Sequence, residues 1–259
     1  MSETRKVRWG ILSTANIGMT KVIPAIMKSA HSEVVAISSR RAEAAHAAAE
    51  TLGIGRAYGS YEAMLADPDI DAIYNPLPNH LHVDLTLAAN AAGKHVLCEK
   101  PIALNAVEAT RLRAANPDCL IMEGFMVRFH PQWLRTMQIV QSGEIGEVRA
   151  VRAVFSYHNI DPASVRNMPE IGGGAMLDIG CYPIAAGRYF FRYELPKTVD
   201  LTVTDTPGTN LKDGRVVGIA GPVVDVEFPR GALPELNSAL EFDVTLEGET
   251  IKVLAEVAQ

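Results

Sequence analysis

The chain has 259 residues, which is enough for one large domain or two of ordinary size, and we predict two domains. Its 24 Lys and Arg residues against 30 Asp and Glu residues give a net charge of -6, which argues against a polyanion-binding surface and so against nucleic acid as a partner. The N-terminal residues lack a signal-type apolar segment, and no apolar run approaches the roughly 18 residues of a membrane span, so we expect a cytoplasmic protein with no membrane partner.

In the first half of the chain, short apolar runs alternate with helical patterns. The predicted strands span 7–12, 33–38, 70–78, 94–100 and 119–124. The predicted helices span 16–29, 41–52, 80–93 and 105–116. Gly53 is the usual residue just past a helix end, and we expect Asn79 to cap the third helix. Such units form a doubly wound parallel sheet of the Rossmann type, with its ligand crevice at the carboxyl ends of the strands.

The second half of the chain has a different pattern. Apolar and polar residues alternate in 147–157, 198–206, 223–228 and 239–246, which predicts half-exposed antiparallel strands. A helical segment spans about 175–191. The fold class is therefore α/β, with a dinucleotide-binding Rossmann domain over 1–122 and an α+β substrate-binding domain on a largely antiparallel sheet over 123–259. Cys98, Cys119 and Cys181 have no C-x-x-C spacing, so we expect neither a zinc site nor a disulfide framework.

The turn after the first strand, in "WGILSTANIG", has the outline of a nucleotide-binding fingerprint with two of its glycines replaced. Ser13 and Ala15 stand at the first two glycine positions, and Gly18 stands at the third. Both replacements are small, and the N–H groups of Thr14, Ala15 and Asn16 could still face a phosphate from a helix N-terminus. The alternative is an ordinary strand-to-helix turn.

The end of the second strand indicates which cofactor binds. An NAD-binding domain usually places Asp or Glu there against the ribose hydroxyls, but this chain has "SSRR" at 38–41. Ser39 and Arg40 suit a 2′-phosphate, because a guanidinium binds phosphate with a planar fork of donors. NADP is therefore favoured over NAD. The alternative is that Arg40 and Arg41 are solvated residues that open a helix.

Two further stretches could carry chemistry. In "CEKPI", Glu99 and Lys100 reach the crevice, and Lys100 is either a surface cation or a catalytic one. In "GGGAMLDIGCYPI", Asp178 and Tyr182 have the spacing that puts side chains on one helical face. The pKa of Tyr, about 10, would have to fall for a base near neutral pH, and a nearby ammonium such as that of Lys100 lowers it. Taken singly, a tyrosine such as Tyr182 is more often a core aromatic, and an aspartate such as Asp178 is more often a cap or turn residue.

Several motifs in order resemble one family, the glucose-fructose oxidoreductase and inositol dehydrogenase (Gfo/Idh/MocA) family. They are "WGILSTANIG", "YNPLPNHLH", "CEKPI", "EGFMVRFHP" and "NIDPASVRNMPEIGGGAMLDIGCYPI". The resemblance implies hydride transfer between nicotinamide C4 and a sugar or polyol carbon, with Lys100, Asp178 and Tyr182 as the catalytic set. Tyr182 replaces the His of many members, as in the branch of aldose oxidoreductases, xylose dehydrogenases and dihydrodiol dehydrogenases.

The same resemblance implies a cofactor site. Its residues, with those read from the strand ends, are Ser13, Thr14, Ala15, Asn16, Ile17, Ser39, Arg40, Leu77, Pro78, Asn79, His82, Glu99 and Lys100. Arg166 should face the nicotinamide or the substrate. His80 and His82 suggest a metal pair, but no third ligand is evident and the family chemistry uses no metal.

After Tyr193 the resemblance weakens, because family members carry a longer sheet, although 223–234 resemble a family strand and loop. Members often form dimers through the open face of that sheet, so the resemblance implies a homo-oligomer through the C-terminal sheet. We predict an NADP-dependent oxidoreductase acting on a carbohydrate (an aldose or keto-sugar) or a cyclic diol. The alternatives are a non-catalytic dinucleotide-binding sensor and an inactive remnant of the family.

Overall fold

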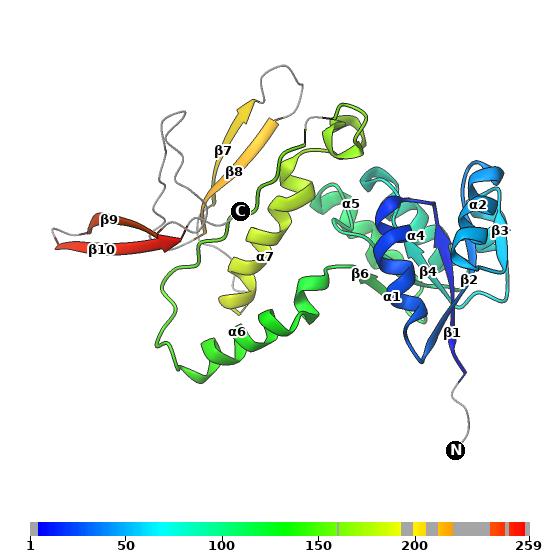
Figure 1. The fold of residues 1–259 in the computed structure, drawn as a ribbon, viewed down its shortest axis with the longest axis horizontal. Helices are drawn as coiled ribbons and strands as arrows, with labels where there is room; N and C mark the ends of the chain where they lie inside the picture. The colour runs from blue at the N-terminus through cyan, green and yellow to red at the C-terminus, as the bar shows by residue number, and fades with distance from the viewer. Residues whose placement is uncertain are drawn as a thin grey trace. The chain divides into compact units, whose positions relative to one another are not determined.

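The computed structural model describes residues 5–159 and 161–192, together with strands at 199–205, 212–219, 239–246 and 249–256. The chain divides into two compact units (Figure 1). The first consists of Met1–His130 with Met168–Gly173, and the second of Pro131–Asn167 with Gly174–Gln259. The units thus separate at His130, after the boundary that the sequence predicts at 122.

The first unit is built on a six-stranded sheet of order β3-β2-β1-β4-β5-β6, in which every neighbouring pair is parallel. The strands are β1 Val7–Leu12, β2 Ser32–Ser38, β3 Arg56–Tyr58, β4 Ala72–Asn75, β5 His95–Cys98 and β6 Ile121–Glu123. This order is that of a Rossmann domain, which confirms the predicted parallel, doubly wound sheet. The sequence analysis missed β3, because its three residues are too few to show a periodic pattern.

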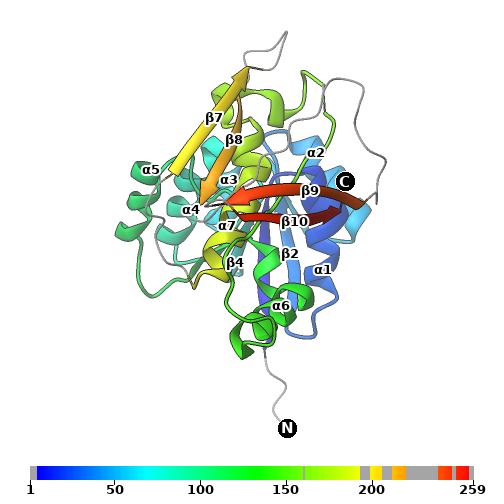
Figure 2. The same ribbon diagram turned by 90° about the vertical axis from the view of Figure 1, so that its left-hand side faces the viewer.

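Helices cover both faces of this sheet, as Figure 2 shows. They are α1 Ile23–Met27, α2 Ala42–Leu52, α3 Tyr61–Leu65, α4 His82–Ala91 and α5 Ala106–Thr110. Neighbouring residues of one strand point to opposite faces, so Ile11 packs with α1 and α2 while Leu12 packs with α3 and α4. Two separate apolar clusters therefore hold the helices in place, as a sheet buried on both sides requires.

Local signals in the sequence account for several helix ends. Gly53 ends α2 with a φ of 68°, the left-handed conformation that favours glycine, as predicted. Asn105 caps α5 by accepting a hydrogen bond from Glu108 N at 2.9 Å. The predicted cap at Asn79 was wrong, because Asn79–Leu81 form a 3-10 turn before α4 and no side chain caps either element. The Asn79 amide instead donates to the Gly172 carbonyl at 2.7 Å.

The second unit contains the helices α6 Pro131–Ser142 and α7 Cys181–Phe190. Trp133 of α6 packs against Tyr189 and Phe190 of α7, with ring centroids 5.5 and 5.8 Å away. Beyond them, β7 Val199–Asp205 pairs antiparallel with β8 Lys212–Ile219, and β9 Ala239–Leu246 pairs antiparallel with β10 Glu249–Glu256. None of the described helices combines the length and the apolar character that crossing a membrane requires.

The strand expected at 147–157 was wrong, because residues 147–159 have no regular secondary structure. Alternation of apolar and polar residues does not by itself make a strand, because the backbone N–H and C=O groups also need a neighbouring strand to pair with. β7 and β9 coincide with the segments expected at 198–206 and 239–246. The strand expected at 223–228 lies outside the described residues.

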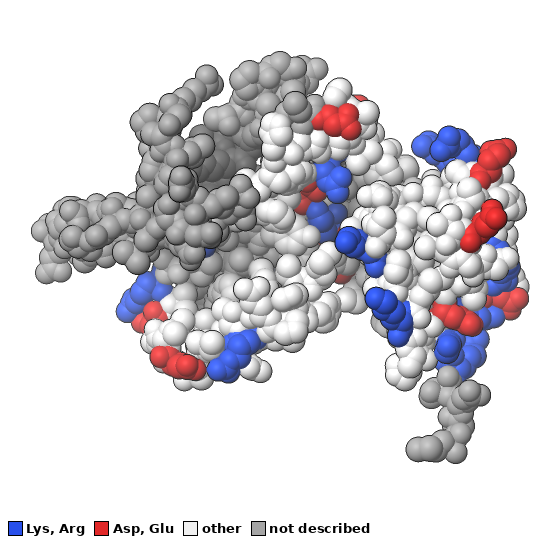
Figure 3. Space-filling view, in the orientation of Figure 1, with Lys and Arg blue, Asp and Glu red and all other residues white. Residues whose placement is uncertain are grey.

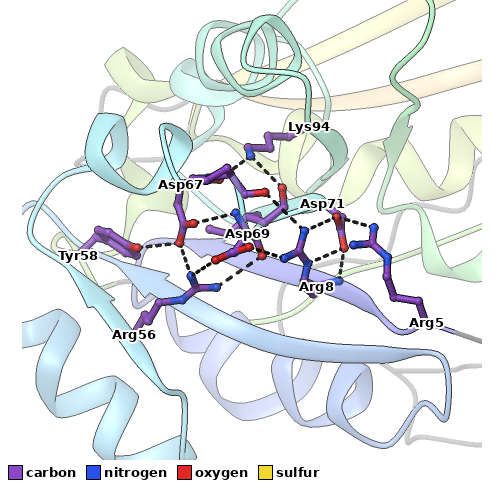
Figure 4. A network of polar contacts seen from close by, with 10 residues as sticks. Arg5, Arg8, Arg56, Tyr58, Asp67, Asp69, Asp71 and Lys94 are labelled. Atoms are coloured by element: carbon purple, nitrogen blue, oxygen red, sulfur yellow. Dashed lines mark hydrogen bonds and ion pairs between the residues drawn. The ribbon is translucent and has the colours of Figure 1, made fainter.

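A polar network ties together the amino-terminal ends of the strands in the first unit (Figure 4). Asp71, just before β4, accepts hydrogen bonds from Arg8 N at 2.9 Å, Arg8 Nη2 at 3.0 Å and Arg5 Nη2 at 2.9 Å. Lys94, only 5% exposed, donates to the carbonyls of Asp67 and Ile70. The loop of residues 67–71 is thus fixed to β1 and to the start of β5.

We expect Asp71→Ala to lower the free energy of unfolding by about 1 to 3 kcal/mol, because it leaves half-buried donors of Arg8 without a partner. The Arg8 hydrogen bonds hold the pKa of Asp71 well below its usual range. Its stabilisation is therefore present above the unfolded-state pKa, about 3.9, and is lost as the pH falls below that value.

Chemical denaturation at pH 7 and at pH 3 measures both effects. The control is Asp69→Ala, because Asp69 also contacts Arg8 but its side chain is 64% exposed. The difference between parent and Asp71→Ala should shrink at the lower pH. An undiminished difference there, or an equal loss in Asp69→Ala, would contradict the role assigned to this carboxylate.

Candidate active site

The turn after β1 keeps the conformation of a glycine-rich fingerprint although serine stands at its first position. Ser13 has a φ of 79°, and its N–H donates to the Ser38 carbonyl at 3.0 Å. Its hydroxyl accepts a hydrogen bond from Ala15 N at 3.2 Å, so one of the N–H groups expected to face a phosphate is bonded within the turn. A helix then runs from Asn16 to Met27. Gly18 is buried in it, and a Cβ there would lie 3.4 Å from the Tyr74 ring.

The end of β2 presents cations and no carboxylate. The Ser39 hydroxyl accepts a hydrogen bond from Arg41 N at 3.3 Å and so shapes the turn. Arg40 is exposed, and its positive charge acts on the half-buried Tyr61 phenol. Burial raises the pKa of Tyr61, and Arg40 offsets part of that increase. Arg40 and Arg41 are both exposed at this end of β2.

The loop after β4 is fixed by buried side chains. Asn75 is fully buried, donates to the His82 carbonyl at 3.2 Å, and accepts a hydrogen bond from Leu77 N. His82 is 1% exposed, and its two ring nitrogens lie 2.7 Å from Pro101 O and 2.6 Å from Leu77 O. The imidazole therefore joins the loop after β4 to the loop after β5.

Glu99 and Lys100 follow β5 directly, and both are half-buried. The Tyr74 hydroxyl donates to Glu99 Oε1 at 2.7 Å, and the Lys100–Pro101 peptide bond is cis. Burial, together with the Glu99 carboxylate, raises the pKa of Tyr74 well above its usual range, so this phenol remains a hydrogen-bond donor. Burial also raises the pKa of the Cys98 thiol to about 12, which makes it an inert core residue.

A short segment from later in the chain, Met168–Gly173, belongs to the first unit. Gly172 has a φ of 85°, and its carbonyl accepts the hydrogen bond from the Asn79 amide. A Cβ at this position would clash with Leu104 and Asn79. Sequence reasoning did not single out Gly172, although the run of three glycines at 172–174 was the available signal.

In the second unit, Asp178 is the centre of a polar cluster. It lies in a π-helical turn, Met176–Gly180, and its side chain is 14% exposed. The Tyr157 hydroxyl donates to Oδ2, and Arg166 Nε lies 3.3 Å from the carboxylate. Both oxygens are thus held by groups from a different segment of the same unit, which fixes the carboxylate.

Tyr157 was missed by sequence reasoning, because it lay within a segment interpreted as a strand. Burial, reinforced by the Asp178 carboxylate, raises its pKa, so Tyr157 is a donor and not a base. Tyr182 lies in the first turn of α7, and its ring packs against Phe155 with centroids 5.4 Å apart. Of the two phenols, Tyr182 is therefore the better candidate for proton transfer.

The predicted site residues fall into two groups. The turn at 13–16, the loop at 77–82 and the pair Glu99 and Lys100 follow β1, β4 and β5, which are neighbours in the sheet of the first unit. Arg166, Asp178 and Tyr182 belong to the second unit. Within the described residues, His, Cys, Asp and Glu side chains form no group of three that could hold a metal ion.

Two family models identify the chain. The model of the GFO/IDH/MocA oxidoreductase family, NAD-binding Rossmann fold, matches residues 7–119, and that of the GFO/IDH/MocA C-terminal domain matches residues 133–233. The chain belongs to the GFO/IDH/MocA oxidoreductase family, as its motifs predicted. A third model, the β-barrel domain of the ATP synthase alpha/beta family, matches residues 216–259. Residues 223–228 are therefore covered by the models of two different families.

Individual proteins agree with this assignment. The chain is 54% identical over 194 residues to an uncharacterized oxidoreductase of Rhizobium meliloti, covering 73% of this chain and 57% of that protein. It is 42% identical over 236 residues to D-xylose 1-dehydrogenase (NADP(+)) 2 of Haloferax volcanii, covering 90% of this chain and 69% of that protein. The chain therefore spans little more than half the length of the first of these relatives.

A solved structure is similar over almost the whole chain. It is KijD10, a 3-ketoreductase from Actinomadura kijaniata in complex with NADP and TDP-benzene. Its TM-score is 0.70 at 27% identity, and the match covers 98% of this chain and 86% of that one. The Rossmann fold and the family that the sequence predicts for the first unit therefore agree with the observed sheet and with the family model.

The left-handed backbone at Ser13 predicts an order of stability. Ser13→Gly should be more stable than Ser13→Ala by about 1 to 2 kcal/mol, because both lose the hydroxyl but only glycine is relieved of the strain at φ 79°. Thermal or chemical unfolding of the two variants measures the difference. An alanine variant at least as stable as the glycine variant would show that the turn is not strained.

Proposed function

We propose that the protein is an NADP-dependent oxidoreductase that transfers hydride between nicotinamide and a carbon of a carbohydrate (an aldose or keto-sugar) or a cyclic diol. One observation carries the proposal. The fingerprint-like turn, the loop at 77–82 and Lys100 follow three neighbouring strands of a Rossmann sheet, in a chain that belongs to an oxidoreductase family. The crevice outside such strand ends is where dinucleotides bind.

NADP is the preferred cofactor in this proposal. Arg40 is an exposed guanidinium at the end of β2, and residues 38–41 contain no carboxylate to repel a 2′-phosphate. The Haloferax relative is named for NADP(+), and the KijD10 structure contains NADP. The remaining contacts in the proposal come from two sets of residues. The resemblance assigns Ser13, Thr14, Ala15, Asn16, Ile17, Leu77, Pro78, Asn79, His82 and Arg166, and the strand ends add Ser39 and Glu99.

The protein's own groups supply the proton transfer. The nicotinamide supplies the hydride acceptor or donor when it is bound. Tyr182 takes the proton of the substrate hydroxyl, or returns it in the reductive direction, and Lys100 favours the phenolate form. Asp178, held by Tyr157 and Arg166, orients this set. The second unit would contribute the substrate-binding α+β domain proposed for 123–259, with a largely antiparallel sheet.

The proposed setting is the cytoplasm, with a small-molecule substrate and neither nucleic acid nor membrane as a partner. On the face shown in Figure 3, Lys and Arg lie beside Asp and Glu over the described residues of the first unit, which does not favour a polyanion. Pairing of chains through the open face of the C-terminal sheet is the proposed homo-oligomer.

A screen of aldoses and cyclic diols with NADP and NAD, followed by nicotinamide absorbance, tests the activity. Turnover on at least one substrate is expected. Tight NADPH binding without turnover on any of them would favour the dinucleotide-binding sensor instead.

Cofactor choice gives a separate prediction. Arg40→Ala should weaken NADP binding roughly ten- to a hundredfold and NAD binding far less, because a charged hydrogen bond to the 2′-phosphate contributes about 1.5 to 3 kcal/mol. Titration calorimetry with both cofactors measures the two dissociation constants, and Arg41→Ala is the neighbouring control. Equal losses for NADP and NAD in Arg40→Ala would refute the assignment.

Tyr182→Phe should keep the fold and cofactor binding and lose turnover by about 10² to 10⁴-fold, because it removes only the proton-transferring hydroxyl. Lys100→Met should act on the same step, so the two losses should be strongly non-additive in the double variant. Steady-state kinetics of the two single variants and the double variant measure this coupling. Near-full turnover in Tyr182→Phe would place the acid/base elsewhere, with Asp178 or His158 as the next candidate.

A further inference from the structure

We propose that Tyr74 and Glu123 are positioning residues for Lys100, because each holds the chain on one side of it. The inference rests on the proposed role of Lys100. It concerns two side chains that no cofactor or substrate contact requires. Both belong to the first unit, and both lie on strands that flank β5, from which the Glu99–Lys100 pair emerges.

Tyr74 acts on the residue before Lys100. It is fully buried in β4, and its hydroxyl donates to Glu99 Oε1 at 2.7 Å. The Glu99 N–H donates in turn to the Asn75 carbonyl at 3.0 Å, so both the main chain and the side chain of Glu99 are bound to β4. Glu99 Oε2 also lies 3.4 Å from Lys100 N. The carboxylate therefore connects the buried phenol to the backbone of the lysine.

Glu123 acts on the residues after Lys100. It is the last residue of β6, and its Oε1 accepts a hydrogen bond from Ile102 N at 2.9 Å. The next residue, Gly124, donates from N to the Cys98 carbonyl at 2.6 Å, which continues the sheet pairing to the last residue of β5. A Cβ at Gly124 would lie 3.2 Å from that carbonyl, so glycine permits the close approach. The backbone is thus bound at 98, 99 and 102.

These contacts matter because Lys100 lies outside any regular element. Lys100 itself is part of no strand or helix, and a side-chain amine at the end of a flexible stem can only be placed if its backbone is placed. A catalytic group misplaced by about 1 Å can cost about 10²-fold in rate. Binding the chain on both sides is therefore a physical requirement for a lysine that must reach one atom.

A purely structural role would have a different outcome, and the chain offers a matched control. Tyr58 donates to Asp67 Oδ2 at 2.7 Å, which is the same kind of phenol–carboxylate bond at the same distance as that between Tyr74 and Glu99. It lies in the same sheet, but its partner belongs to the loop before β4, at the opposite edge. Tyr58→Phe therefore removes an equivalent bond without touching the chain around Lys100.

The experiment compares Tyr74→Phe, Glu123→Ala, Glu123→Gln and Tyr58→Phe in the full-length chain. Tyr74→Phe and Glu123→Ala should lower kcat about tenfold with little change in KM, as partial loosening of the lysine predicts. Glu123→Gln should recover most of the loss, because its amide oxygen can still accept the Ile102 N–H. Tyr58→Phe should leave kcat unchanged. An equal fall of kcat in Tyr58→Phe, or unchanged kcat in Tyr74→Phe, would overturn the proposal.

A second readout does not depend on turnover. Trace acetylation with acetic anhydride, quantified by mass spectrometry of the peptides, gives the relative labelling rate of the half-buried Lys100 against the exposed Lys28. This ratio should rise in Tyr74→Phe and Glu123→Ala, remain near the parent value in Glu123→Gln, and not change in Tyr58→Phe. An unchanged ratio in both of the first two variants overturns the positioning role. A chain without turnover whose ratio rises as expected refutes the proposed function and leaves the positioning intact.

Discussion

The parallel pairing of β1 with β2 on one side and with β4 on the other is the constraint on which the site depends. The strand order reverses there, because the chain continues from β1 to β2 and β3 in one direction and from β4 to β6 in the other. The turn after β1 consequently lies beside the ends of both neighbours. In a Rossmann domain, the turn after β1 faces the phosphates of a bound dinucleotide, and the end of β2 faces a ribose. The loops after β4 and β5 are then left for the reacting end.

The two edges of this sheet are held by different kinds of interaction. At the amino-terminal edge, Arg8, Asp71 and buried Lys94 form ion pairs and charged hydrogen bonds that fix a loop. At the carboxyl edge, the buried neutral donors Tyr74 and Asn75 bind the Glu99 carboxylate and the His82 carbonyl. The exposed Arg40 lies at the carboxyl edge, whereas the ion pair of Arg8 with Asp71 lies at the amino-terminal edge.

Structural features that depend on neighbouring residues in the sequence could be predicted, and contacts between residues far apart in the sequence could not. Apolar runs predicted most of the parallel strands, and Gly53 predicted the end of α2, because its effect is local. Asn79 is a residue type that caps helices, but its oxygen caps none here, and its amide donates to Gly172, 93 residues away in the chain. The role of Tyr157 could not be predicted, because it depends on a hydrogen bond to Asp178, which lies in another segment of the chain. Motifs reveal the groups that face a ligand, and they omit those that hold such groups in place.

Residues 216–259 match a β-barrel domain of another family, and the proposed chemistry assigns no role to any of them. Every residue assigned here to cofactor binding or catalysis lies before residue 193, upstream of that match. The cofactor edge belongs to the first unit, and the cluster around Asp178 belongs to the second. In the proposed function, most cofactor contacts come from the first unit, and proton transfer is assigned to Tyr182 of α7 in the second unit. The proposal therefore treats cofactor binding and turnover as separate properties, and each must be measured by itself.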